Sequence, residues 1–171
     1  KAFQNALEIR ERLARAEPDR VDYQRDLSVS YNKMGDLYRD LGQGEAARKA
    51  FQNALEIAER LARAEPDRAD YQRDLSISYN KMGDLYRDLG QVEAAHDAYK
   101  KDLEIAERLT RAEPDRADYQ WDLVVSLVRF ADPALLGRAL TILRTLDDAG
   151  SLNPDQRDLI TRLEDQLARK S

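Results

Sequence analysis

Cysteine is absent from this 171-residue sequence, which excludes disulfide bonds, thiolate zinc sites and cysteine nucleophiles. Proline and glycine are scarce, with five and seven residues, so long uninterrupted elements are expected. No apolar run approaches the ~20 residues that a helix needs to cross a bilayer, and no signal peptide is recognisable. A cytoplasmic location without membrane contact is therefore the default expectation. Because Lys1 lies inside a helical pattern, the sequence is expected to be a fragment.

Charge of one sign is not concentrated anywhere along the sequence. The 28 basic and 33 acidic residues give a net charge of −5 and are spread over the whole length. The absence of a basic block argues against nucleic acid or an anionic membrane as partner. His96 is the only histidine, and no glycine-rich phosphate loop or serine in a nucleophile context is present. The sequence thus predicts a protein that is not an enzyme, with no catalytic residues, cofactor or metal ligands.

An internal repeat of 48 residues dominates what is present. Residues 1–48 and 49–96 are identical at 43 of 48 positions, and a third copy stays close from Asp97 through Leu123 before it diverges. Self-similarity at a fixed period is the signature of a repeat architecture.

Two helical patterns alternate within each period. The first, about residues 22–41, places apolar side chains three and four residues apart, and the second, about 45–64, presents small residues and Phe51. The segment Glu65-Pro66-Asp67 should end the second pattern, with Asp67 as N-cap of the next helix. Gly35 and Gly83 are expected where paired helices come closest, opposite alanines. Eight helices without strands are predicted, over about residues 2–16, 20–41, 44–64, 68–89, 92–112, 116–131, 133–149 and 154–169.

The repeated residues resemble the tetratricopeptide repeat. The series Tyr31-x2-Met34-Gly35-x2-Tyr38 is followed by Ala47-x3-Phe51, and the next copy repeats it. The family period is 34 residues, and the extra residues fall where they lengthen each helix by two turns. The resemblance implies an all-α, right-handed α-solenoid of antiparallel helix pairs, similar to arrays in bacterial multidomain signalling proteins. Residues 1–131 form the expected array, and residues 132–171 a divergent last repeat that ends in a capping helix.

In the tetratricopeptide family the first helix of each repeat lines the concave surface, so the resemblance implies a binding groove there. Opposite the apolar stripe, each copy carries alternating charges with one aliphatic residue. The candidate partner-binding residues are Arg25, Val29, Asn32, Asp36, Arg39, Asp40, Arg73, Ile77, Asn80, Asp84, Arg87, Asp88, Trp121 and Val125. The bland alternative for this ladder is a solvated face with ion pairs between neighbouring helices.

The third copy departs from the ladder, because Trp121 and Val125 stand where the earlier copies carry Arg73 and Ile77. These residues would form an apolar anchor point for a partner. Alternatively, the helix that begins after Pro133 covers them.

The function predicted from these features is a scaffold that binds a protein or peptide partner. Two alternatives stay open: a self-assembly module, and a sensor of peptides or small molecules within a larger regulator. The helix over residues 2–16 carries apolar residues, among them Phe3 and Leu7, without the first helix that would cover them. A weak homodimer through residues 1–16 is therefore expected.

Overall fold

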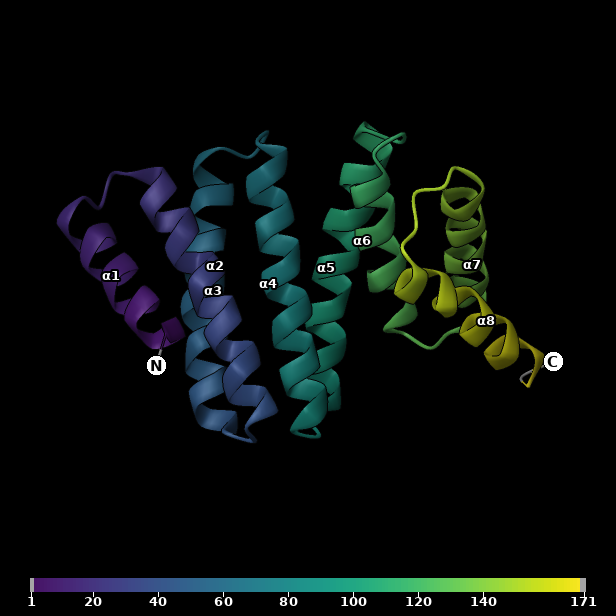
Figure 1. Cartoon of the computed structure of the whole chain (residues 1–171), viewed down its shortest axis with the longest axis horizontal. Coiled ribbons are helices and arrows are strands. Elements are labelled where there is room, and N and C mark those ends of the chain that lie inside the picture. Colours follow the sequence, from purple (N-terminus) through teal and green to yellow (C-terminus); the bar gives the residue numbers. More distant parts are fainter. Residues whose placement is uncertain (1, 170–171) are drawn as a thin grey trace. The chain divides into compact units, whose positions relative to one another are not determined.

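The computed structural model describes the backbone of residues 2–169 and the side chains of residues 5–169. Within this range the chain forms eight helices and no strand, an all-α helical repeat fold of the solenoid class (Figure 1). The helices are α1 (Ala2–Ala16), α2 (Val21–Asp40), α3 (Gly44–Ala64), α4 (Ala69–Asp88), α5 (Val92–Ala112), α6 (Ala117–Val128), α7 (Pro133–Asp148) and α8 (Pro154–Ala168). No helix in the described range is long and apolar enough to span a membrane.

The chain divides into two compact units, Lys1–Asp102 and Leu103–Ser171, with α5 continuing from the first into the second. In the first unit α3 packs against both α2 and α4, and α2 also contacts α4. Alanines on α3 allow this close packing, since Ala47, Ala54 and Ala58 are at most 1% exposed. The Ser28 hydroxyl donates to the carbonyl of Ala54 at 3.0 Å and fixes the register of α2 on α3.

The close approach at the helix glycines is confirmed, but the partner expected there was wrong. A Cβ atom added at Gly35 would collide with the ring of Phe51, and one added at Gly83 would lie 2.5 Å from a ring carbon of Tyr99. The glycines therefore make room for an aromatic ring rather than for alanines. Because such a ring is large and flat, only a residue without a side chain permits the contact.

The N-cap expected at Asp67 was also wrong. Arg68 occupies the N-cap position of α4 without a capping hydrogen bond from its side chain. Its guanidinium instead donates to both carboxylate oxygens of Asp70, at 2.8 and 2.9 Å, and stacks on Tyr71. The same group of three residues recurs at the start of α2 and of α6. A charge on the first turn of the helix thus replaces a cap, since Asp70 lies at the positive end of the helix dipole.

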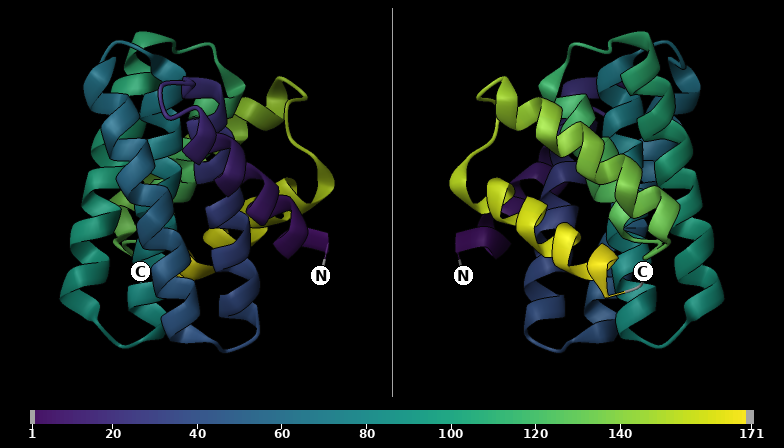
Figure 2. Two further views of the ribbon diagram at one scale, coloured as in Figure 1. Left: turned by 90° about the vertical axis from the view of Figure 1, so that its left-hand side faces the viewer. Right: turned by 90° about the vertical axis from the view of Figure 1, so that its right-hand side faces the viewer.

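The second unit is built on one apolar core shared by α6, α7 and α8. Helices α7 and α8 lie side by side in Figure 1 and in the right-hand view of Figure 2. Both have true caps, because the side chains of Asp132 and Asn153 accept from backbone N–H groups of the first turn. Leu163 of α8 is buried, whereas the charged side of this helix is exposed. Helix α8 therefore has the amphipathic character that the sequence predicts.

Helix α6 ends at Val128, three residues before the predicted end. Ala131 has a positive φ of 51°, which turns the chain out of the helix. Asp132 is extended, as a residue before proline must be, and leads into α7 at Pro133. The sequence signals at Asp132-Pro133 were recognised, whereas the turn at Ala131 carries no glycine that would reveal it.

Candidate functional site

The candidate groove residues of the first unit lie on α2 and α4, and most of them join the two helices to each other. The Arg25 guanidinium donates to Asp74 at 2.5 Å and also pairs with Asp70. The amide of Asn32 donates to the Ser78 hydroxyl at 3.1 Å. The ammonium of Lys81 donates to both oxygens of Asp36, at 2.7 and 2.9 Å. The bland alternative of ion pairs between neighbouring helices therefore describes much of this ladder.

Near the C-terminal ends of α2 and α4, candidate residues also pair with each other, and some of their side chains are buried. Arg39 pairs with Asp84 at 3.5 Å and with Asp88 at 3.8 Å. Asp84 is only 6% exposed, and it also accepts from the hydroxyl of Tyr99 at 2.7 Å. Asn80 donates to the buried carboxylate of Asp102 at 2.8 Å. Asp84 and Asp102 are thus used in the packing of the first unit, whereas the Asp88 side chain stays 45% exposed.

A smaller set of the candidate residues stays accessible. Val29 and Ile77, in the middle of α2 and α4, are 40% and 37% exposed. Asp40, Arg87 and Asp88 are exposed near the ends of the same helices, and Arg73 is half-buried. Val29 and Ile77 occupy the same position in successive repeats, so they form two equivalent apolar points on one helix layer.

In the second unit Trp121 is half-buried and packs against the core of α6, α7 and α8. Val128 packs against the same core, and Val125 is half-buried. The indole of Trp121 is therefore partly covered within the second unit, which agrees with the alternative that the helix after Pro133 covers it.

The partners that the sequence analysis missed follow a simple rule. Each contact between α2 and α4 joins residues 45 to 49 positions apart, which is about one repeat. In a stack of period 48, side chains at the same level of neighbouring first helices are separated by about this number. A search for opposite charges one repeat apart would have identified Lys81 and Asp74.

The electrostatics of the site follow from these pairs. The hydrogen bond to Asp74 raises the pKa of Arg25, against the effect of desolvation. The hydrogen bond from Arg68, with a smaller contribution from Arg25, lowers the pKa of Asp70. Both groups thus stay charged over the physiological range. Among residues 5–169, no group of three or more histidine, aspartate or glutamate side chains is placed to hold a metal ion.

The sequence profile of the tetratricopeptide repeat family matches residues 26–108, the region that contains most of α2, all of α3 and α4, and most of α5. This chain is a tetratricopeptide repeat protein. The matched region holds the stacked helix pairs, and tetratricopeptide repeats are generally protein-interaction modules. The family is typically a scaffold without catalytic activity. No curated protein sequence matches the chain.

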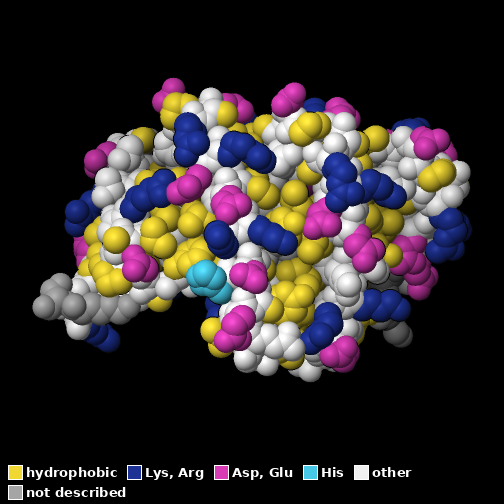
Figure 3. Space-filling model, turned by 180° about the vertical axis from the view of Figure 1, so that it is seen from behind, with side chains coloured by type: hydrophobic (Ala, Val, Ile, Leu, Met, Phe, Trp, Pro, Cys, Tyr) yellow, Lys and Arg dark blue, Asp and Glu magenta, His cyan; other side chains and the backbone are white. Residues whose placement is uncertain are grey.

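His96 of this tetratricopeptide repeat protein is solvent-exposed on α5. Figure 3 shows the histidine in cyan on a face where basic and acidic side chains alternate.

Proposed function

We propose that this tetratricopeptide repeat protein is a non-catalytic module that binds an extended peptide or protein segment. The binding surface is the exposed face of α2 and α4 that carries Val29 and Ile77. The observation that carries the proposal is the pair of exposed aliphatic residues, Val29 at 40% and Ile77 at 37%, at equivalent positions of neighbouring repeats. A segment with two apolar side chains at a matching distance would contact both. The surrounding charges would then supply direction and register more than affinity.

The ion pairs around these residues support such a surface. Arg25, Asp36 and Lys81 are already fixed by their partners, so their remaining donor and acceptor sites are held in place before a ligand arrives. A surface that is ordered in advance loses less conformational entropy on binding. The exposed Asp40, Arg87 and Asp88 add groups that can pair with a charged segment.

Panning a random peptide library on the purified protein tests this proposal. Selected peptides should lose affinity for an Ile77→Glu variant by about tenfold or more, the effect of one lost apolar anchor. Val92→Glu is the matched control, because Val92 is 67% exposed at the start of α5 and lies outside the candidate residues. Peptides that bind the Ile77→Glu variant as well as the parent, or that lose affinity equally for the Val92→Glu variant, would contradict the proposal.

A further inference from the structure

The exposed face of α2 and α4 has a regular geometry that limits what fits across it. Two side-chain hydrogen bonds fix the level of α2 on α4 around this face: Arg25 to Asp74, 49 positions apart, and Asn32 to Ser78, 46 positions apart. Val29 lies between Arg25 and Asn32 in the sequence, so it is level with a residue about one repeat later, which is Ile77. We call the surface that joins Val29 and Ile77 the aliphatic strip. It runs directly across the two helices.

The hydrogen bond between Asn32 and Ser78 also limits the distance across the strip. Both side chains are short and the bond is 3.1 Å long, so bond lengths keep the two Cα atoms within about 9 Å of each other. Helices in direct contact have axes about 8–10 Å apart, and α2 contacts α4. The two aliphatic residues of the strip are therefore spaced by about 9 Å.

This spacing selects among the conformations of a bound segment. A polyproline II helix rises about 3.1 Å per residue with three residues per turn, so every third side chain lies on one face, about 9 Å from the next. In a β-strand, side chains on one face are about 7 Å apart, and the next ones along are about 13 Å apart. Only an α-helix with side chains seven residues apart, about 10 Å, matches the strip as well as polyproline II does.

The polar side chains beside the strip favour polyproline II over an α-helix. The Arg25 guanidinium and the Lys81 ammonium have more N–H donors than the bonds that they form with Asp70, Asp74 and Asp36. Both side chains remain accessible, at 40% and 29% exposure. The carbonyl groups of a polyproline II helix form no internal hydrogen bonds and can accept from these donors, whereas the carbonyls of an α-helix are already bonded. Proline adds carbonyl acceptors without adding N–H donors.

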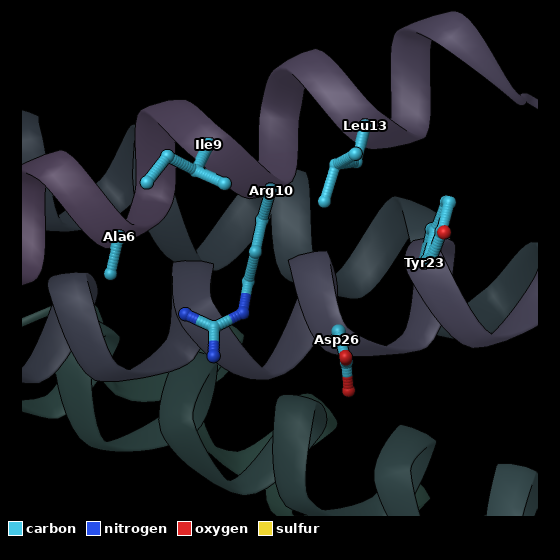
Figure 4. Close-up of a pocket in the computed structure, with 6 residues that line it drawn as sticks. All are labelled: Ala6, Ile9, Arg10, Leu13, Tyr23 and Asp26. Atoms are coloured by element: carbon cyan, nitrogen blue, oxygen red, sulfur yellow. The ribbon is translucent and has the colours of Figure 1, made fainter.

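On the side toward α1, Val29 borders a hollow of about 330 Å³. This hollow adjoins the one in Figure 4, because Ala6, Arg10 and Asp26 line both. Helix α1 is of the second kind in its repeat and offers no equivalent of Val29, so the strip on α2 and α4 has two aliphatic points. The homodimer expected through residues 1–16 would use the side of α1; of its predicted residues, the side chain of Phe3 lies outside the described residues.

We propose that the segment bound across α2 and α4 is a proline-rich polyproline II helix with aliphatic side chains three residues apart. One aliphatic side chain contacts Val29 and the next contacts Ile77, while carbonyl groups of the segment accept from Arg25 and Lys81. The proposal rests on the function proposed above and adds the conformation and the residue spacing of the ligand.

Fluorescence anisotropy with labelled proline-rich peptides tests this spacing on the whole chain. Three peptides have the same length and composition, and their two leucines are separated by one, two or three prolines. The peptide with two intervening prolines should bind about fivefold more tightly than the other two, because only its leucines reach both aliphatic points. A fourth peptide, alanine-rich and helical, carries two leucines seven residues apart and represents the rival conformation. It should bind more weakly than the best proline-rich peptide.

Ile77→Ala should abolish the preference among the three proline-rich peptides, since with one aliphatic point left the spacing has no effect. Val92→Ala is the matched control, because Val92 is 67% exposed on α5 and lies outside the strip; this variant should keep the preference.

Four results would each overturn the proposal: tighter binding of the helical peptide, equal affinities of the three proline-rich peptides, no saturable binding of any of them at millimolar protein, or a preference that persists in Ile77→Ala. The function proposed above fails separately. It stands in all four cases if library-selected peptides of any other spacing or conformation still lose affinity for the Ile77→Glu variant.

Discussion

Gly83→Ala tests the packing of the helix pairs most sharply. The new Cβ would lie 2.5 Å from the Tyr99 ring, which is 4% exposed and cannot move into solvent. The Tyr99 hydroxyl is also bound to the buried carboxylate of Asp84 at 2.7 Å, so a shift of the ring strains that hydrogen bond. Overpacking of this kind costs about 1–3 kcal/mol, while replacing glycine inside a helix returns about 1 kcal/mol.

Gly137→Ala separates these two effects. Gly137 lies inside α7 with no atom within 4 Å of an added Cβ, so only the helix-propensity gain applies. Urea unfolding followed by circular dichroism should show Gly137→Ala stabilised by about 0.5–1 kcal/mol, and Gly83→Ala less stable than Gly137→Ala by about 1–3 kcal/mol. Tyr99→Leu in the Gly83→Ala background should recover part of the loss. Equal stabilities of the two alanine variants would refute the packing described here.

Four further outcomes follow from local structure. Burial and the hydrogen bond to Glu11 raise the pKa of Tyr31 to about 12, above its unfolded value of about 10. The protonated hydroxyl therefore stabilises the folded state fully below about pH 10, and this contribution is lost as the pH rises through about 12. Tyr31→Phe should weaken the pH dependence of the melting temperature in that window. Ala131→Gly should raise the unfolding free energy by about 0.5–1 kcal/mol in urea titrations, because Ala131 has a φ of 51°. Asn153→Ala, which removes the capping box of α8, should lower it by about 1 kcal/mol, whereas Asp67→Ala should leave it unchanged in the same titrations. A double-mutant cycle of Arg25→Ala and Asp74→Ala should give a coupling of about 0.5–1 kcal/mol, since the Arg25 side chain is 40% exposed, and a coupling of zero would contradict the ion pair.

The fold was predictable because one pattern is repeated. The 48-residue period, the proline segments and the glycine turns place the ends of most helices within a residue or two. The end of α6 was missed because it depends on a positive φ at Ala131, a residue without conformational preference for that region. The sequence predicts Asp67 as the N-cap of α4, whereas the structure has Arg68 there. This difference of one residue depends on the exact turn that follows Pro66, which the sequence does not reveal.

The candidate site was only partly predictable, since a helical wheel shows which side chains share a face but not what the next helix offers them. The wheel placed Arg25, Asn32 and Asp36 on one face of α2, and their partners on α4 became evident only from the structure. Buried Asp84 accepts from the hydroxyl of Tyr99, for which the second copy has no equivalent because Phe51 stands at that position. The exposure of Val29 and Ile77, on which the proposed function rests, agrees with their predicted place opposite the apolar stripe.

The most direct test of the central claim is to locate a selected peptide on the protein by NMR chemical-shift perturbation. A uniformly labelled sample is titrated with a peptide from the library selection. The account predicts the largest amide shifts along α2 and α4 around Val29 and Ile77, with residues of α8 unchanged. Shifts confined to α8, or to α1 without α4, would contradict binding on the exposed layer of the first helices.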